Sequence, residues 1–231
     1  MDKLISPADA VNLIRSGDRL LVGGFGLSGT PRSLIDKLAE RDVRDLTVIS
    51  NNLGTVGQGL GKLLAARQIK KVIGSYFTTN RDVVQAWERG ELEIELVPQG
   101  TFVEAIRAAG AGIGGFYTKT AVGTLLAEGK EHRVIGGETY VFQEPIGGDV
   151  ALIKAWKADT LGNLVYYKAA NNFNQVMATA ARITIAEVDE IVEAGALKPE
   201  EIQTPHVYVD YVVLGEYVKV GGRYVARPGN A

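Results

Sequence analysis

The chain has 231 residues, 46% of them hydrophobic, which is enough for a sizeable core. A formal net charge of -2 offers no basic surface for nucleic acid, and the lack of cysteine in the sequence excludes disulfides and thiolate chemistry. The start of the chain, "MDKLISPADA", has no apolar run typical of a signal peptide, and no apolar stretch reaches the roughly 20 residues that span a bilayer. We therefore expect a soluble, cytoplasmic protein that binds neither nucleic acid nor membranes.

Helices and strands alternate in the predicted structure of the first 110 residues. Strands are predicted at 19–25, 45–52, 70–77 and 92–100, and helices at 4–17, 30–42, 57–68, 80–90 and 101–110. Ser6 should cap the first helix, with Pro7 at its first position and Gly17 at its end. Thr30 should cap the second helix, followed by Pro31. Successive β-then-α units favour a mainly parallel sheet flanked by helices.

Strand patterns dominate the second half of the chain. Residues 132–142 predict a hairpin around Gly136 and Gly137, because a diglycine between two β-branched runs favours a tight turn. Further strands are predicted at 149–159, 163–167, 182–193 and 206–214, a helix at 172–181, and a second hairpin at 216–226 around Gly221 and Gly222. No linker composition divides the chain. We predict one α/β domain with a mainly parallel sheet and an antiparallel hairpin excursion.

Glycines and neutral amides follow three of the predicted strands. They are Gly23, Gly24 and Gly26 after the first strand, Asn51, Asn52 and Gly54 after the second, and Pro98, Gln99 and Gly100 after the fourth. Ligands of open parallel sheets bind outside the carboxyl ends of the strands, where these residues are expected. They offer neutral donors and bare backbone, and no charge.

Histidine chemistry has little support in the sequence. His132 and His206 are the two histidines of the chain, and neither is flanked by a plausible catalytic partner. We interpret both as solvated surface residues. No spacing typical of zinc ligands occurs, so no metal site is expected.

The segment "GFGLSG" leaves a nucleotide-binding alternative open. Its glycines, Gly24, Gly26 and Gly29, fit the Gly-x-Gly-x-x-Gly pattern between a strand and a helix. The acidic residue expected about twenty positions later, at the end of the next strand, is replaced by "SNN". The fingerprint of an NAD-binding Rossmann oxidoreductase is therefore incomplete.

Several motifs in one order resemble a known family. "LLVGGFGLSGTP" is similar to the signature loop of the class I CoA-transferases, in which an apolar strand runs into Gly-Gly-Phe. The resemblance continues through "VRDLTVISNN", "LEIELVPQGTFVEAIRAAGAGIGGFYT", "AVGTLLAEGK", "DVALIKAWKADTLGNLVYYKAANNFN" and "ITIAEVDEIVEAGALKPEEIQTPHVYVDYVV". It implies a CoA-transferase-like domain at 1–214, similar to the A (alpha) subunit of the 3-oxoacid CoA-transferases, and a C-terminal hairpin extension at 215–231.

The resemblance implies a shared catalytic unit. In this family the nucleophile is a glutamate of a Ser-Glu-Asn-Gly segment in the B subunit, and this chain contains no Glu-Asn-Gly. The chain is thus expected to be the non-nucleophilic A subunit of a heterodimer or heterotetramer. Its partner would carry a glutamyl-CoA thioester while CoA passes between succinyl-CoA or acetyl-CoA and a 3-oxoacid such as acetoacetate. CoA is then a substrate, and no permanently bound cofactor is expected.

The resemblance also suggests roles for individual residues. Gln99 would donate to the acyl or glutamyl oxygen, and Asn51 and Asn52 would orient the acid. The loop residues Gly23, Gly24, Phe25 and Gly26 would form a wall of the shared site.

Structural interpretations compete with each of these roles. Asn51 and Asn52 also fit a closing turn, and the glycine loop also fits tight packing without a ligand. Residues 110–118 are either a flap or a plain connection. The group Asn171, Asn172, Phe173 and Asn174 is either functional or partly used to cap the next helix. A non-catalytic, ligand-binding member of the same fold remains a further alternative.

Overall fold

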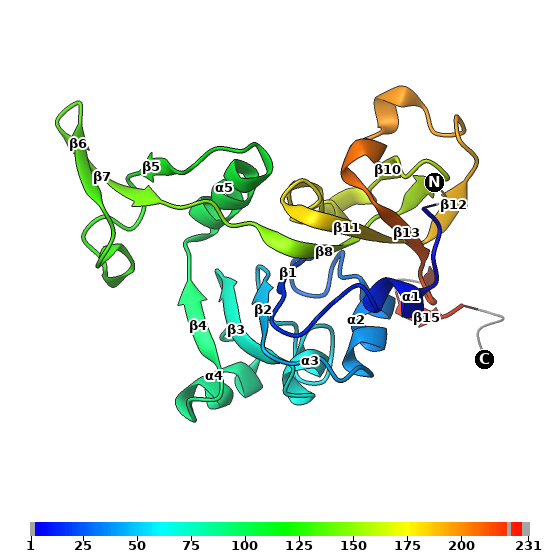
Figure 1. The fold of residues 1–231 in the computed structure, drawn as a ribbon, viewed down its shortest axis with the longest axis horizontal. Coiled ribbons are helices and arrows are strands. Elements are labelled where there is room, and N and C mark those ends of the chain that lie inside the picture. Colours follow the sequence, from blue (N-terminus) through cyan, green and yellow to red (C-terminus); the bar gives the residue numbers. More distant parts are fainter. Residues whose placement is uncertain (1–2, 221–222, 228–231) are drawn as a thin grey trace.

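A central sheet runs through the computed structural model, with helices on both sides of it (Figure 1), and the structure describes residues 3–220 and 223–227. Within these ranges the sheet has seven strands, all paired in parallel, in the order β13-β11-β8-β1-β2-β3-β4. Their bounds are β1 Arg19–Val22, β2 Leu46–Ile49, β3 Ile69–Gly74, β4 Glu93–Leu96, β8 Gly148–Lys154, β11 Ala181–Val188 and β13 Tyr211–Leu214. The predicted fold class is confirmed.

Two hydrophobic cores, one on each face of the sheet, hold the helices. Along β1, Leu20 and Val22 belong to one core and Leu21 to the other, as the alternation of a strand requires. The helices of the first core are α1 Pro7–Val11, α2 Arg32–Ala39, α3 Gly61–Ala65 and α4 Arg81–Glu88, and those of the second are α5 Gln99–Gly110 and α6 Asn174–Met177. Burial on both faces explains why the strands read as near-continuous apolar runs.

The predicted start of the first helix is confirmed, but its end is wrong. Ser6 Oγ accepts a hydrogen bond from Asp9 N at 3.1 Å, and Pro7 is the first helical residue. The helix ends at Val11. Gly17 instead bonds through its N–H to Arg44 O at 2.9 Å, because the chain must turn there into β1.

The predicted cap of the second helix is also wrong. Pro31 occupies the N-cap position of α2 and makes no side-chain cap bond, and an N–H of the first turn, that of Leu34, donates to Glu187 Oε2 instead. Thr30 is buried, and its hydroxyl lies 3.5 Å from Gly26 O. Packing against the glycine loop therefore overrides the capping preference of threonine.

Two predicted strands are divided because the chain changes sheets within them, and a third is shortened. Residues 149–159 form β8 and β9 Lys157–Asp159, residues 182–193 form β11 and β12 Glu190–Val192, and residues 163–167 keep only β10 Leu164–Val165. Trp156 marks the change, since its N–H bonds to Val165 O and its carbonyl accepts from Asp189 N, each at 2.9 Å. Strands β9, β10 and β12 thus form a separate small sheet.

Two other predicted elements are shorter in the structure. Residues 206–208 form a single 3-10 turn, so strand β13 begins only at Tyr211. The predicted helix at 172–181 shrinks to the one turn of α6, since Ala181 already belongs to β11.

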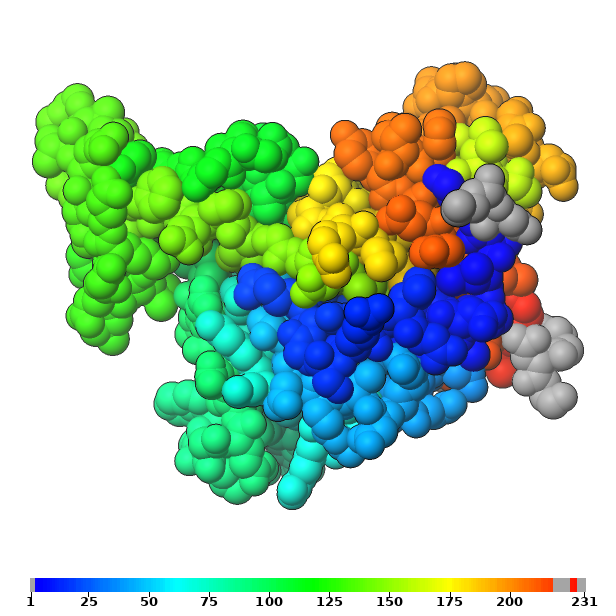
Figure 2. Space-filling view, viewed as in Figure 1, coloured from blue at the N-terminus to red at the C-terminus, as the bar shows by residue number. Residues whose placement is uncertain are grey.

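The antiparallel excursion projects from the body as a separate arm at the left of Figure 1, and Figure 2 shows the hollow between arm and body. Its strands are β5 Phe116–Thr118, β6 His132–Ile135 and β7 Glu138–Gln143. Gly136 and Gly137 have φ values of 59° and 84°, as a two-residue hairpin turn between twisted strands requires. The predicted hairpin is confirmed, and the stretch 110–118 ends in strand β5.

The described segment before α1 pairs with the edge of the central sheet. Val212 of the edge strand β13 accepts from Ile5 N at 3.1 Å and donates to Lys3 O at 2.8 Å. The C-terminal strands β14 Tyr217–Val220 and β15 Arg223–Ala226 pair antiparallel, and the predicted turn at 221–222 lies outside the described residues. No helix in the described part of the chain is long and apolar enough to cross a membrane.

Candidate functional site

Three predicted site residues form one chain of side-chain hydrogen bonds. Asn51 and Asn52 follow β2, and Gln99 is the first residue of α5, which follows β4, two strands away in the sheet. Asn52 Nδ2 donates to Asn51 Oδ1 at 3.1 Å, and Asn51 Nδ2 donates to Gln99 Oε1 at 3.0 Å. Because parallel strands end at one edge of the sheet, residues 48 positions apart meet there.

The orientation of Gln99 follows from this chain. Its Oε1 is occupied as an acceptor, and among the described residues its Nε2 has no hydrogen-bond partner. Asn51 and Asn52 are 3% and 6% exposed, whereas Gln99 is more accessible. A buried pair of amides thus fixes a glutamine whose donor group is available to a ligand.

Ser75 is a member of this cluster that the sequence interpretation missed. Its hydroxyl accepts from Asn51 Nδ2 at 2.9 Å and lies 3.4 Å from Gln99 Oε1. Ser75 follows β3, the one strand among the first four whose end was not predicted to carry a neutral donor. The same rule about carboxyl ends of strands would have found it.

Asn52 also closes the turn that was the alternative structural interpretation of this residue. Its Oδ1 accepts from Gly54 N at 2.8 Å, an Asx-type closure of the loop after β2. The turn bond uses Oδ1 and the cluster bond uses Nδ2. The structural and the functional interpretation of Asn52 are therefore compatible.

The glycine loop after β1 makes a tight exposed turn. Phe25 and Ser28 exchange two backbone hydrogen bonds of 3.0 and 3.1 Å, with Gly26 at φ 61° between them. Phe25 is 53% exposed at the tip. A second turn, with Thr55 and Gln58 bonded in the same way, lies in the loop after β2, so the helix predicted at 57–68 begins only with α3.

These two loops lie against each other. The space between them is about 10 Å³ and is lined by Gly23, Gly24, Gly26, Leu27, Thr30, Ser50, Asn52, Gly54 and Leu60. Such a volume holds about one water molecule and no larger ligand. The predicted wall residues Gly23, Gly24 and Gly26 therefore share a border with Asn52, while Phe25 does not line this space.

The position at which a Rossmann fold binds its nucleotide is filled in this protein. Strand order reverses between β1 and β8, the switch point at which a dinucleotide would lie. A Cβ on Gly23 would lie 1.8 Å from Asn174 Oδ1 there. The close approach that glycine permits is therefore used by a protein side chain.

A buried charge cluster lies beside this switch point. Lys154 Nζ contacts Asp189 Oδ1 at 2.7 Å and Glu187 Oε1 at 3.2 Å, and Glu187 Oε2 accepts from Leu34 N at the start of α2. Burial lowers the pKa of the Lys154 ammonium, but the two carboxylates outweigh this and leave the pKa above its ordinary value. The charges of the cluster oppose each other, so it anchors structure without offering a free cation.

Neither histidine belongs to a segment that carries the amide cluster. His132 is on the arm and His206 is in the turn before β13, and both are exposed, as expected. Among residues 3–220 and 223–227, no three His, Cys, Asp or Glu side chains gather closely enough to hold a metal ion.

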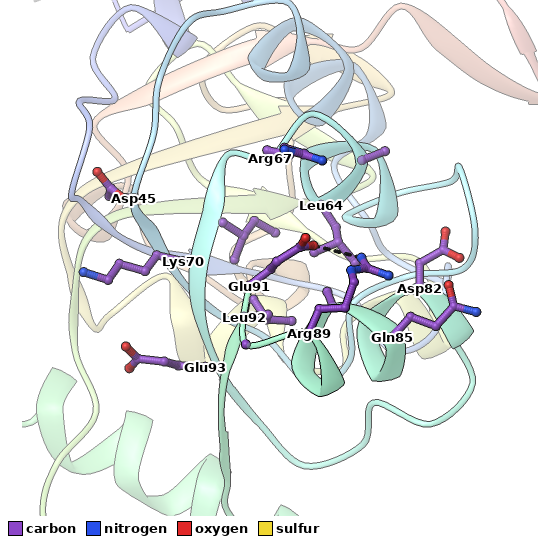
Figure 3. Close-up of a pocket in the computed structure, with 14 residues that line it drawn as sticks. Asp45, Leu64, Arg67, Lys70, Asp82, Gln85, Arg89, Glu91, Leu92 and Glu93 are labelled. Atoms are coloured by element: carbon purple, nitrogen blue, oxygen red, sulfur yellow. Dashed lines mark hydrogen bonds and ion pairs between the residues drawn. The ribbon is translucent and has the colours of Figure 1, made fainter.

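A larger cavity lies at the opposite, amino edge of the sheet (Figure 3). It measures about 540 Å³ and is lined by the starts of β3 and β4 and by parts of α3 and α4. Its charges oppose each other: Arg89 and Glu91, joined by the dashed line in Figure 3, pair at 2.8 Å. None of the predicted site residues lines it.

An all-parallel sheet with neutral donors at its carboxyl edge is typical of α/β proteins that bind ligands at the strand ends. The coenzyme A transferase family matches residues 4–215, and the chain belongs to that family. It is 57% identical, over 93% of its length and 91% of the relative, to the A subunit of a probable succinyl-CoA:3-ketoacid coenzyme A transferase of Bacillus subtilis. It is 44% identical, over 94% of its length and 99% of the relative, to the alpha subunit of the acetate CoA-transferase of Escherichia coli K12.

A solved structure shares the fold. An acyl-CoA transferase of E. coli O157:H7, determined as a thioester complex with CoA, superposes with a TM-score of 0.85 at 22% identity. The match covers 99% of this chain and 50% of that one, so this chain spans about half of that enzyme. The family match and the two relatives confirm the family resemblance and do not favour the NAD-binding alternative.

Proposed function

We propose that this chain is the non-nucleophilic A subunit of a CoA-transferase that moves CoA between succinyl-CoA or acetyl-CoA and a 3-oxoacid such as acetoacetate. The observation that carries the proposal is the hydrogen-bonded chain from Asn52 through Asn51 to Gln99, which leaves the Gln99 Nε2 donor open. The names of the relatives, parts of a 3-ketoacid and of an acetate transferase, support the substrate class.

The reaction proceeds by ping-pong chemistry through a glutamate of the partner. Its carboxylate attacks the acyl-CoA carbonyl, the C–S bond breaks, and CoA leaves as a thiolate from a mixed anhydride. The thiolate attacks the glutamyl carbonyl, which releases the acyl carboxylate and leaves a glutamyl-CoA thioester. A second acid takes CoA by the reverse steps. Thiolate and carboxylates are competent nucleophiles and leaving groups, so no histidine is needed.

Gln99 stabilises the oxyanions of these steps. Each attack places negative charge on a carbonyl oxygen, and a preorganised N–H donor lowers the energy of that state. Asn51 holds the Gln99 amide so that Nε2 is the group that faces the ligand. A neutral donor suits a carboxylate substrate, because a fixed cation would also stabilise the bound ground state and slow turnover.

The partner docks on the carboxyl edge of the sheet. Exposed apolar residues follow or end each of the first four strands, namely Phe25, Val56, Tyr76 and Leu96. They come from three loops and the end of β4, at the same edge of the sheet as the amide cluster. We propose that the B subunit covers these apolar residues and brings its Ser-Glu-Asn-Gly segment to Gln99, as a heterodimer or heterotetramer. CoA binds as a substrate in this shared site, and a cytoplasmic location remains a prediction.

The domain division is part of the proposal. Residues 1–214 form the transferase domain, and residues 215–231 are an extension whose described strands β14 and β15 pair as a hairpin. The family match to residue 215 supports this division. Contacts of the hairpin with α2 support a bracing role, since Tyr217 Oη donates to Asp36 Oδ2 at 2.7 Å and Glu216 N donates to Ser33 Oγ at 2.8 Å.

Reconstitution tests the proposed function. Turnover of acetoacetate with succinyl-CoA is measured for this chain, for a B subunit that carries Ser-Glu-Asn-Gly, and for the mixture. We expect activity only in the mixture, with hydroxylamine or borohydride trapping the intermediate on the B subunit. Activity of this chain without a partner would show that one of its own glutamates is the nucleophile. Silence of the mixture with succinyl-, acetyl- and acetoacetyl-CoA would favour the non-catalytic alternative.

A further inference from the structure

Asn174 occupies an unusual position for a polar side chain. It is 0% exposed, at the first residue of the one-turn helix α6. The residue before it, Phe173, occupies the N-cap position, so Asn174 does not cap the helix. Its amide is instead fully used in contacts with other segments, as a buried amide must be to avoid a large cost.

The amide of Asn174 joins three parts of the chain. Oδ1 accepts from Lys154 N at 2.8 Å, at the carboxyl end of β8. Nδ2 donates to Gly29 O at 2.9 Å in the glycine loop and to Ala170 O at 2.8 Å in the segment before α6. A single side chain therefore ties the end of the glycine loop to the sheet across the switch point.

The glycine loop is shaped around this amide. The Cβ that any other residue would place at Gly23 lies 1.8 Å from Asn174 Oδ1, and at Gly29 it lies 2.8 Å from Asn174 Nδ2. Asn172 adds a neighbouring bond from its Nδ2 to Ser28 O at 3.1 Å. Hydrogen bonds thus hold the loop at Ser28 and Gly29, and Asn174 packs closely against Gly23 at its other end.

We propose that Asn174 is a positioning residue that fixes the glycine loop, which carries Phe25 at its tip, beside Asn52 of the amide cluster. The proposal rests on the proposed function, because it assigns the loop to the shared site. Asn174 acts through the Gly29 carbonyl and does not itself face a ligand. Aspartate would keep the size of the side chain but would turn acceptors toward Gly29 O and Ala170 O, so only an amide satisfies all three backbone groups.

Kinetics of Asn174→Asp in the reconstituted enzyme provide the first test. We expect kcat to fall by about 10- to 100-fold, the range for an ångström-scale misplacement, while KM for the acid stays within about threefold. KM is spared because the Asn51 and Gln99 contacts are intact. Gln175→Ala, at the more exposed neighbouring position of the same helix, is the matched control and should leave both constants unchanged. A rise in KM without a fall in kcat would overturn the proposal.

Hydrogen exchange tests the same role without transferase activity. The backbone amides of Phe25 and Ser28 bond each other's carbonyls, so their exchange reports the loop turn. In Asn174→Asp these two amides should exchange at least about tenfold faster, with the amides of Thr55 and Gln58 unchanged. Equal acceleration everywhere, or none at Phe25 and Ser28, would contradict the positioning role. A failed reconstitution of the unmodified protein would refute the proposed function but not this result.

A double-mutant cycle with Gly23→Ala completes the test. The new methyl group clashes with the Asn174 amide, and Asn174→Ala removes the obstacle. Gly23→Ala should therefore speed loop exchange less in the Asn174→Ala background than in the unmodified chain. Strict additivity would overturn the proposal. If the Asn174 variants do not fold, Asn172→Ala, which removes the bond to Ser28 O, should still accelerate Ser28 exchange, and unchanged Ser28 exchange there would count against the positioning role.

Discussion

The two edges of the parallel sheet differ in both shape and charge. The carboxyl edge carries a tight cluster of neutral amides, with a space of about 10 Å³ between its loops. The amino edge carries a cavity of about 540 Å³ lined by opposing charges. The cavity at the amino edge is thus far larger than the space between the loops at the carboxyl edge. If the proposed partner completes the site, one wall is missing in the isolated subunit, and the chemistry of the donors is then a better guide to the site than its volume.

The ion pairs at the two edges also differ in burial. Beside the carboxyl edge, Lys154 is buried between Glu187 and Asp189. At the amino edge, Arg89 and Glu91 pair in solvent. The same kind of interaction therefore anchors the structure at one edge and does little at the other.

The largest expected effect is the loss of this buried anchor. Lys154→Met should lower the free energy of unfolding by about 3–5 kcal/mol, because it leaves a buried carboxylate without its cation. Arg89→Met is the control from the amino edge, and it should leave the unfolding curve unchanged. Urea unfolding of the isolated chain measures both. Equal losses for the two variants would remove the distinction between the edges.

The next effect concerns catalysis. Gln99→Ala should slow the reconstituted enzyme by about 10²-fold or more, the scale of one lost oxyanion donor. Gln85→Ala removes an amide that lines the amino-edge cavity and should change kcat by less than about twofold. Steady-state kinetics of both variants decide which edge holds the site. Unchanged turnover in Gln99→Ala would remove Gln99 from the mechanism, and a large loss in Gln85→Ala would move attention to the cavity.

The smallest expected effect concerns the hydrogen bond from Tyr217 to Asp36 of α2, the helix that follows the glycine loop. The hydrogen bond to the Asp36 carboxylate raises the pKa of Tyr217 to about 12, above the ordinary value of 10.0. The unfolded chain then loses this proton first, so the stabilisation is complete below pH 10 and is lost as the pH rises from 10 to 12.

Tyr217→Phe removes this hydrogen bond. It should lower stability by about 1 kcal/mol below pH 10, the scale of one part-buried hydrogen bond. The difference from the unmodified chain should vanish toward pH 12. Thermal unfolding at pH values below 10 and near 12 measures it. A difference that grows with pH would show that the Tyr217 hydroxyl is not held by Asp36.

Local patterns in the sequence predicted much of the fold. The apolar strands, the Ser6 cap and the Gly136–Gly137 hairpin depend on neighbouring residues, and the structure confirms them. The division at Trp156 was missed, because an apolar run does not show which of two sheets it joins. The predicted cap at Thr30 was also wrong, because contact with the glycine loop overrides the capping preference of threonine.

The sequence predicted which residues belong to the candidate site, but not the hydrogen bonds that join them. That Asn51, Asn52 and Gln99 end up at one sheet edge follows from their places after parallel strands. That Gln99 opens a helix and leaves Nε2 available depends on the bond from Asn51, which no local pattern records.

The sequence by itself determined the family, the parallel sheet and the neutral chemistry of the strand ends, because each depends on residue types in a fixed order. Only the tertiary structure decided that Ser75 joins the amide cluster and that Asn174 occupies the switch point. The hydrogen bond from Asn174 to Gly29, for example, joins residues 145 positions apart in the chain. The geometry of such contacts is set by how the loops pack, and packing is a property of the whole fold.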